Sequence, residues 1–187
     1  MKKLLLITLL FTFSLNAQEK YGTYKVSGAE ISSSISLDNG KIYLDLEADG
    51  TYGLILTPKK RNSFKLFLEE SQAKFKEWEA TALENNVKDM NKDIKTASYK
   101  GVFRYGSWKI GTASLKTIFW VAEDGAITFY LYGSKMVASD NKYIKSKSAM
   151  LNLTSKDDFD SMINILSDET VDAFKNKKTA SDDMFKN

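Results

Sequence analysis

The chain has 187 residues, with 27 basic and 24 acidic side chains, and it contains neither histidine nor cysteine. These absences exclude a Ser-His-Asp or Cys-His nucleophile, a zinc site with imidazole or thiolate ligands, and disulfide bonds. An enzyme with this composition would have to rely on carboxylates, lysine, tyrosine or a metal held by oxygen atoms.

The first 17 residues have the pattern of a secretory signal peptide. Lys2 and Lys3 precede an apolar run at residues 4–15, and the small residue Ala17 precedes the polar Gln18. The apolar run is too short to span a bilayer comfortably, so we expect cleavage after Ala17 rather than an uncleaved anchor. The mature protein would then be periplasmic or secreted, with no stable membrane span.

Without this segment the chain keeps 25 basic and 24 acidic residues, which is close to neutral. Nucleic-acid binding depends on clustered positive charge, so we expect no nucleic-acid partner. The remaining length suits a single domain, which we place at residues 18–171. Residues 172–187 are polar and charge-rich, and we expect them to form a disordered tail.

The first part of the mature chain is predicted to be a three-stranded antiparallel meander. Alternating apolar residues indicate strands at 31–37, 42–46 and 52–56. Keeping their apolar faces together requires a two-residue turn at Asn39-Gly40 and a three-residue turn at Ala48-Asp49-Gly50. Both turns contain a glycine, which tolerates the left-handed backbone that such turns need.

A long helix is predicted next, with Asn62 or Ser63 as its N-cap and Asn85-Asn86 at its end. Apolar and small residues recur at three- and four-residue steps along it. They are Phe64, Phe67, Leu68, Ser71, Phe75, Trp78 and Ala82. We interpret this stripe as the face that covers a sheet, because an exposed stripe of this kind would be an aggregation liability. A partner-binding helix is the alternative.

After a polar connection at residues 87–96, the β-branched and aromatic content predicts more strands. We place them at 99–105, 108–113, 115–121, 127–132 and 149–153. The hydrophobic register predicts a three-residue turn at Glu123-Asp124-Gly125.

A second, shorter helix is expected to begin near Thr154 or Ser155. Its apolar stripe consists of Phe159, Met162, Ile163 and Leu166. The predicted fold class is therefore α+β: a largely antiparallel sheet, with the N-terminal meander plus four or five later strands, packed by one long and one shorter helix.

The 115–132 hairpin has two apolar faces. The register that buries Phe119 places Ile118, Trp120, Tyr130 and Tyr132 on the opposite face. We favour the interpretation that a helix covers this second face, because two helices with apolar stripes need a surface. The alternative is an open aromatic platform that stacks on sugars or docks a partner strand. These four residues are the candidate ligand-binding residues.

Three other patterns suggest chemistry but have simpler interpretations. The sequence DLEADG from Asp45 imitates the start of a calcium loop, but Leu56 stands where a bidentate glutamate is needed. The Ser-Lys pairs at 134–135, 146–147 and 155–156 lack any sign of the buried lysine that such a nucleophile requires. Residues 134–148 are interpreted as a solvated loop. Asp45 and Glu47 share one strand face, about 6–7 Å apart, as paired catalytic carboxylates could. We therefore assign no metal, cofactor or catalytic residue.

The mature chain resembles secreted proteins of unknown function from Bacteroidota-type bacteria. The resemblance lies in LNAQ at the signal-peptide end, in EWEATALENNVKD, and in SDNKYI followed by a strand and a helix. It covers most of the mature chain and implies no activity. The sequence thus predicts a secreted or periplasmic, non-catalytic binding protein with an unknown protein or glycan partner in the cell envelope. A glycosidase-like hydrolase using paired carboxylates is the alternative.

Overall fold

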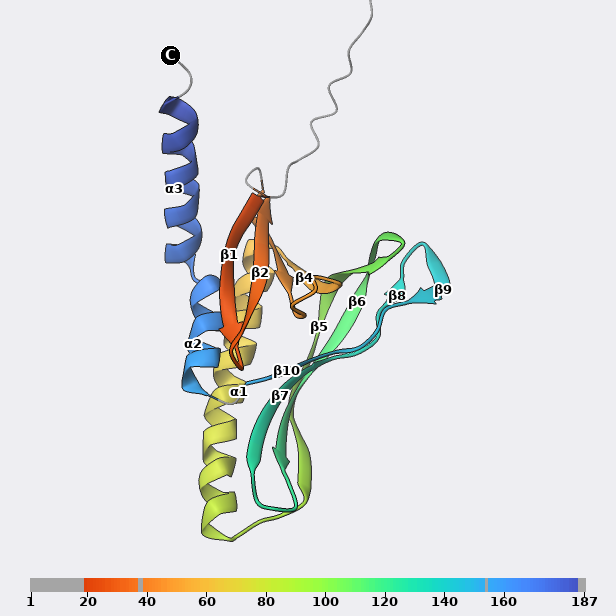
Figure 1. Ribbon diagram of the computed structural model, residues 1–187, viewed down its shortest axis with the longest axis vertical. Helices are drawn as coiled ribbons and strands as arrows, with labels where there is room; N and C mark the ends of the chain where they lie inside the picture. The colour runs from red at the N-terminus through yellow and green to blue at the C-terminus, as the bar shows by residue number, and fades with distance from the viewer. Residues whose placement is uncertain (1–18, 37–38, 154, 185–187) are drawn as a thin grey trace, which may run out of the picture.

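The computed structural model describes residues 19–36, 39–153 and 155–184, so the predicted signal peptide lies outside the described residues. Eight strands in these ranges form one antiparallel sheet in the order β1-β2-β3-β4-β5-β6-β7-β10, and two more form a hairpin. Helices α1 and α2 lie against one side of the sheet, while α3 extends beyond α2 (Figure 1). This arrangement confirms the predicted α+β fold.

The strands are β1 (Glu19–Val26), β2 (Ala29–Ser36), β3 (Lys41–Asp45), β4 (Tyr52–Leu56), β5 (Met90–Tyr105), β6 (Ser107–Val121), β7 (Ile127–Gly133), β8 (Val137–Ala138), β9 (Asn141–Lys145) and β10 (Ala149–Asn152). The helices are α1 (Pro58–Glu84), α2 (Lys156–Ile165) and α3 (Asp168–Met184). From β1 to β7 each strand pairs with the next one along the chain, and α1 is inserted between β4 and β5.

The three-strand meander predicted at the N-terminus is in fact part of a longer one. The sequence pattern does not reveal β1, because its pairing with β2 is irregular between Lys20 and Gly22. A β-bulge breaks the period-two alternation. It lets Tyr21 and Tyr24, three residues apart, both be buried.

The β2–β3 connection differs from the predicted two-residue turn. Ile35 pairs with Ile42, and the Gly40 amide donates to the Ser36 carbonyl over 2.8 Å. The connection is therefore four residues long, and the predicted strand residue Leu37 lies outside the described residues. A shift of two residues keeps every side chain on its predicted face, so the hydrophobic pattern could not distinguish the two registers.

The other two predicted turns are confirmed. The Leu46 amide donates to the Tyr52 carbonyl over 2.8 Å, and the β3–β4 register places Glu47 opposite Thr51, which leaves a three-residue turn ending in Gly50 with φ of 65°. In the β6–β7 hairpin, the Ala122 amide donates to the Ala126 carbonyl over 2.9 Å, and Gly125 has φ of 89°.

Helix α1 begins earlier than predicted and covers the sheet with the predicted stripe. Thr57, rather than Asn62 or Ser63, is its N-cap, because Pro58 suits the first helical position. In the middle of the stripe, the Ser71 hydroxyl is 2.9 Å from that of Thr117 on β6, which satisfies both buried groups. The helix ends at Glu84 with Asn85 as its C-cap, as predicted.

The later strands are longer than their sequence pattern suggests. β5 extends back to Met90 into the predicted polar connection, and β6 runs without interruption through Ser114. Segment 134–148 contains the β8–β9 hairpin rather than only a loop, and Met136 is buried there against Gly101 and Gly111. Pairing with a neighbour over the whole length of β6 stabilises polar residues that have no strand signal of their own.

The C-terminal part is helical. α2 begins after the N-cap Ser155, as predicted, with a capping box completed by Asp158. Residues 172–184 of the expected disordered tail are instead helical and belong to α3, whose Phe174 ring lies 5.3 Å from that of Tyr21 on β1. In the described ranges, no helix has the length and apolarity to cross a membrane.

Candidate functional site

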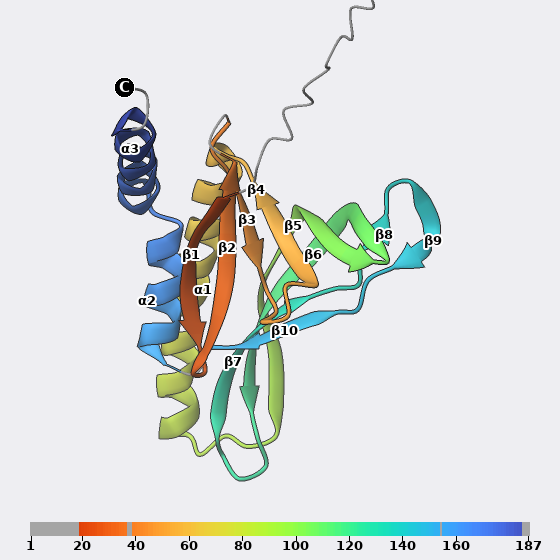
Figure 2. The ribbon, with the colours of Figure 1, turned by 45° about the horizontal axis from the view of Figure 1, so that its top comes forward.

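The two faces of the sheet differ in what covers them. Phe119 on β6 lies 5.5 Å from Phe75 and 5.8 Å from Trp78, both on α1, and Phe129 on β7 lies 4.7 Å from Phe159 on α2. Both helices are therefore on the Phe119 side, and Figure 2 shows them on one side of the sheet. Among the described residues, no helix packs on the opposite face.

The predicted site residues Ile118, Trp120, Tyr130 and Tyr132, called the aromatic patch below, lie on this uncovered face. The prediction that a helix covers them is wrong, because α1 and α2 both pack on the opposite face, which carries Phe119 and Phe129. The structure does bring the patch together: Ile118 pairs with Tyr130, and the Trp120 and Tyr130 rings are 6.0 Å apart. All four side chains are half-buried by their neighbours.

A groove of about 510 Å³ lies on the same face, above β2 to β6, and none of the patch residues lines it. Its apolar lining comes from Tyr43, Ile55, Val102, Trp108 and Ile110. Trp108 is 58% exposed and Ile110 is 42% exposed, on the part of β6 that pairs with β5 and not with β7. A concave apolar surface with a few polar groups is typical of a small-molecule site.

The strand register explains why the surface is hollow there. Gly53 on β4 pairs with Asp45 on β3 and with Val102 on β5, and Val102 pairs with Ile110 on β6. Gly53 is thus the one position without a side chain in a row of outward-facing residues. A Cβ atom at Gly53 would lie 3.0 Å from Oδ1 of Asp45. The glycine therefore leaves room for the Asp45 carboxyl, which lines the groove.

Asp45 is the polar group with the most altered acidity in the groove. Burial, and secondly the charge of Asp49, raise its pKa from 3.8 to about 6. Within the described part of the chain, no group donates a hydrogen bond to its carboxylate. A desolvated carboxyl in a concave site is a common feature of binding and catalytic sites.

The β3–β4 turn holds Asp49 at the rim of the groove. Oδ1 of Asp49 accepts hydrogen bonds from the Thr51 amide (3.0 Å) and the Thr51 hydroxyl (2.7 Å). The hydroxyl bond first, and then the amide bond, lower the pKa of Asp49. The residues of the calcium-like DLEADG sequence are thus used to build a turn. In the described ranges, no three acidic side chains converge as a metal site would require.

The predicted carboxylate pair does not share the groove. Asp45 faces the groove, whereas Oε2 of Glu47 accepts a hydrogen bond from the Thr51 hydroxyl (2.9 Å), and Glu47 lines a neighbouring pocket. The structure instead places Asp49 beside Asp45. The Ser-Lys pairs likewise serve local structure: the Ser146 hydroxyl accepts from the Met136 amide (2.8 Å).

The sequence analysis missed the groove residues, although one signal was present. Val102, Trp108 and Ile110 are apolar residues of predicted strands to whose faces we assigned no role, although apolar residues on a second face had drawn attention to the aromatic patch. Comparisons with protein-family models, with curated proteins and with solved structures find no significant match to this chain. The groove must therefore be interpreted from its own geometry and chemistry.

Proposed function

We propose that this chain is a secreted or periplasmic, non-catalytic binding protein that takes a small, largely apolar ligand in the groove. The observation that carries the proposal is the groove itself. It is concave, it is open, and it leaves Trp108 and Ile110 largely exposed where a second layer of structure would bury them. Exposed apolar surface of this kind is a cost unless something binds it.

The groove offers both affinity and orientation. Each 100 Å² of apolar surface removed from water contributes about 2.5 kcal/mol, part of which is offset by the loss of ligand freedom. The Trp108 ring adds a flat surface for stacking, worth about 1 kcal/mol. Asp45, which lacks a donor among the described residues, can orient a ligand that supplies one.

The place of action and the partner come from the sequence. The apolar N-terminal segment supports export, and the absence of cysteine suits a compartment where thiols would be oxidised. A protein or glycan of the cell envelope is the expected partner that delivers or receives the ligand. Mass spectrometry of the protein from its native host tests the location: a chain that begins at Gln18 is expected, and an intact N-terminal segment in the membrane fraction would overturn it.

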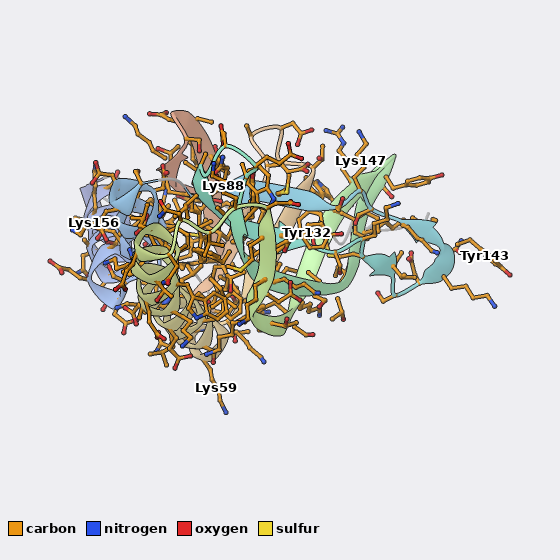
Figure 3. All side chains as sticks on the ribbon, turned by 90° about the horizontal axis from the view of Figure 1, so that it is seen from below. Lys59, Lys88, Tyr132, Tyr143, Lys147 and Lys156 are labelled. Atoms are coloured by element: carbon orange, nitrogen blue, oxygen red, sulfur yellow. The ribbon has the colours of Figure 1, made fainter. Side chains whose placement is uncertain are left out.

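The binding experiment uses the neutral fluorescent probe N-phenyl-1-naphthylamine. We expect saturable binding that weakens about tenfold in Trp108→Ala, a loss of about 1.4 kcal/mol. Tyr143→Ala is the matched control, because Tyr143 is 82% exposed and points away from the body of the molecule at the β8–β9 hairpin (Figure 3). Equal affinity in both variants, or no saturable binding, would contradict the proposal.

A second candidate function, carboxylate-based hydrolysis, rests on one observation. Asp45 has a pKa raised to about 6, while that of Asp49 beside it is lowered. In glycosidases, a similar difference in pKa between two carboxyl groups lets one act as the general acid while the other stays ionised. A glycosidase screen at pH 5 and pH 7 tests it. Activity that is lost in Asp45→Asn and retained in Glu47→Gln would favour the enzyme over the binding protein.

A further inference from the structure

A second cavity, called the basic pocket below, adjoins the groove. It has a volume of about 400 Å³ and lies between the β3–β4 turn, the end of β5 and the residues that flank the β8–β9 hairpin. Four cationic side chains line it: Arg104, Lys135, Lys145 and Lys147. Lys147 and the α1 residue Lys59 point to opposite sides of the molecule (Figure 3).

These four cations differ from two lysines on β6 that are paired with carboxylates. Lys109 is paired with Asp140 at 2.8 Å, and Lys116 with Asp93 at 2.6 Å. In contrast, none of the four makes an ion pair with any described residue. The two carboxylates that line the pocket, Glu47 and Asp49, accept hydrogen bonds from Thr51. With four cations against two carboxylates, the basic pocket has an excess of positive charge.

The groove and the basic pocket share two residues. Asp49 and Arg104 line both cavities, so the two cavities meet at these side chains. The backbone fixes this junction, because the Arg104 amide donates to the Thr51 carbonyl over 3.0 Å. On one side of Arg104 the lining is apolar, with Trp108 and Ile110; on the other side it is cationic.

From this juxtaposition we infer that the ligand is a small amphiphile with an anionic head group. Its apolar part lies in the groove, and its head group lies in the basic pocket among Arg104, Lys135 and Lys147. Charge-assisted hydrogen bonds from arginine and lysine are the strong contacts that an anionic oxygen makes in proteins. This inference rests on the proposed function and specifies the ligand class of the same site.

The test compares three ligands of one chain length by titration calorimetry at pH 7.5: decanoate, 1-decanol and decylammonium. Decanoate is expected to bind about tenfold more tightly than decanol, and decylammonium more weakly than either. The preference for decanoate should shrink as salt is added, because the head-group contacts are partly exposed.

Two double variants with the same change in net charge sharpen the test. Lys135→Gln with Lys147→Gln should reduce the decanoate affinity to that of decanol and leave decanol binding unchanged. Lys59→Gln with Lys142→Gln is the control, since neither of these lysines lines the groove or the basic pocket. The melting temperature of each variant checks that it is folded.

The possible results separate the two proposals. If decanol binds as tightly as decanoate, the ligand needs no anionic head and this inference is overturned, while the proposed function stands. If the control variant loses decanoate affinity as much as the pocket variant, the preference is a general charge effect and the inference also falls. If no ligand binds, the proposed function fails together with the inference.

Discussion

The groove and the aromatic patch lie on the same face of one sheet and are both rich in apolar rings, yet they differ in shape and exposure. In the patch, Trp120 and Tyr130 pack against each other and are half-buried. In the groove, Trp108 is 58% exposed and lines the cavity together with Asp45 and Ile110. Aromatic content alone therefore does not identify a binding surface. Exposed apolar side chains that line a cavity are the better indication.

Stability measurements should separate the two tryptophans most clearly. Trp120→Ala removes a half-buried ring and is expected to lower the free energy of unfolding by about 2 kcal/mol. Trp108→Ala removes a mostly exposed ring and should change it by no more than about 0.5 kcal/mol. Urea denaturation of both variants measures this difference. Equal losses would show that Trp108 is a structural residue, and the comparison would fail.

Gly53→Ala tests the cause of the hollow. The new Cβ atom would lie 3.0 Å from Oδ1 of Asp45 and 3.1 Å from the Leu44 carbonyl oxygen, both too close without some shift. We expect a loss of stability of about 1 kcal/mol, together with weaker ligand binding. Gly22→Ala on β1 is the control, because its Cβ would make only an ordinary contact with Ile165 at 3.4 Å. Unchanged binding in Gly53→Ala would show that this glycine does not shape the groove.

The acidity of Asp45 predicts a smaller, pH-dependent effect. Because its pKa is raised to about 6, folding favours the protonated form. Its contribution to stability is present below the unfolded-state pKa near 3.9 and is lost as the pH rises through about 6. Asp45→Asn should therefore match the wild type at pH 4 and exceed its stability at pH 7.5. Because solvent partly screens this carboxylate, we expect the free energy of unfolding of Asp45→Asn at pH 7.5 to exceed that of the wild type by on the order of 1 kcal/mol.

Asp140→Asn is the control of opposite sign. A hydrogen bond from Lys109 lowers the pKa of Asp140, so its contribution is present at neutral pH and is lost as the pH falls. Urea denaturation at four pH values between 4 and 7.5 measures both differences. A difference between Asp45→Asn and the wild type that does not vary with pH would contradict the assigned pKa.

Local patterns in the sequence were sufficient for the features that depend on neighbouring residues. The turn that ends in Gly50, the turn that ends in Gly125 and the stripe of α1 were all predicted from register and periodicity. β1 was missed because its bulge hides the alternation. The β2–β3 turn was misplaced by two residues because such a shift leaves every side chain on the same face.

The groove could not be predicted in this way, because it depends on which strands are neighbours. Gly53 lies between Asp45 and Val102 only after β4 pairs with both β3 and β5, and α1 separates β4 from β5 in the sequence. The choice of covered face also needed the structure. Both faces of the β6–β7 hairpin are apolar, and the preference of the helices for the Phe119 side is a matter of packing.

The most direct test of the groove as the binding site uses tryptophan fluorescence. The chain has three tryptophans, so Trp78→Phe with Trp120→Phe leaves Trp108 as the only one, and Trp78→Phe with Trp108→Phe leaves only Trp120. Decanoate or decanol bound in the groove should shift the Trp108 emission to shorter wavelength, because its exposed ring becomes covered, and should leave Trp120 unchanged. A shift of the Trp120 emission with none for Trp108 would contradict the account and assign binding to the aromatic patch.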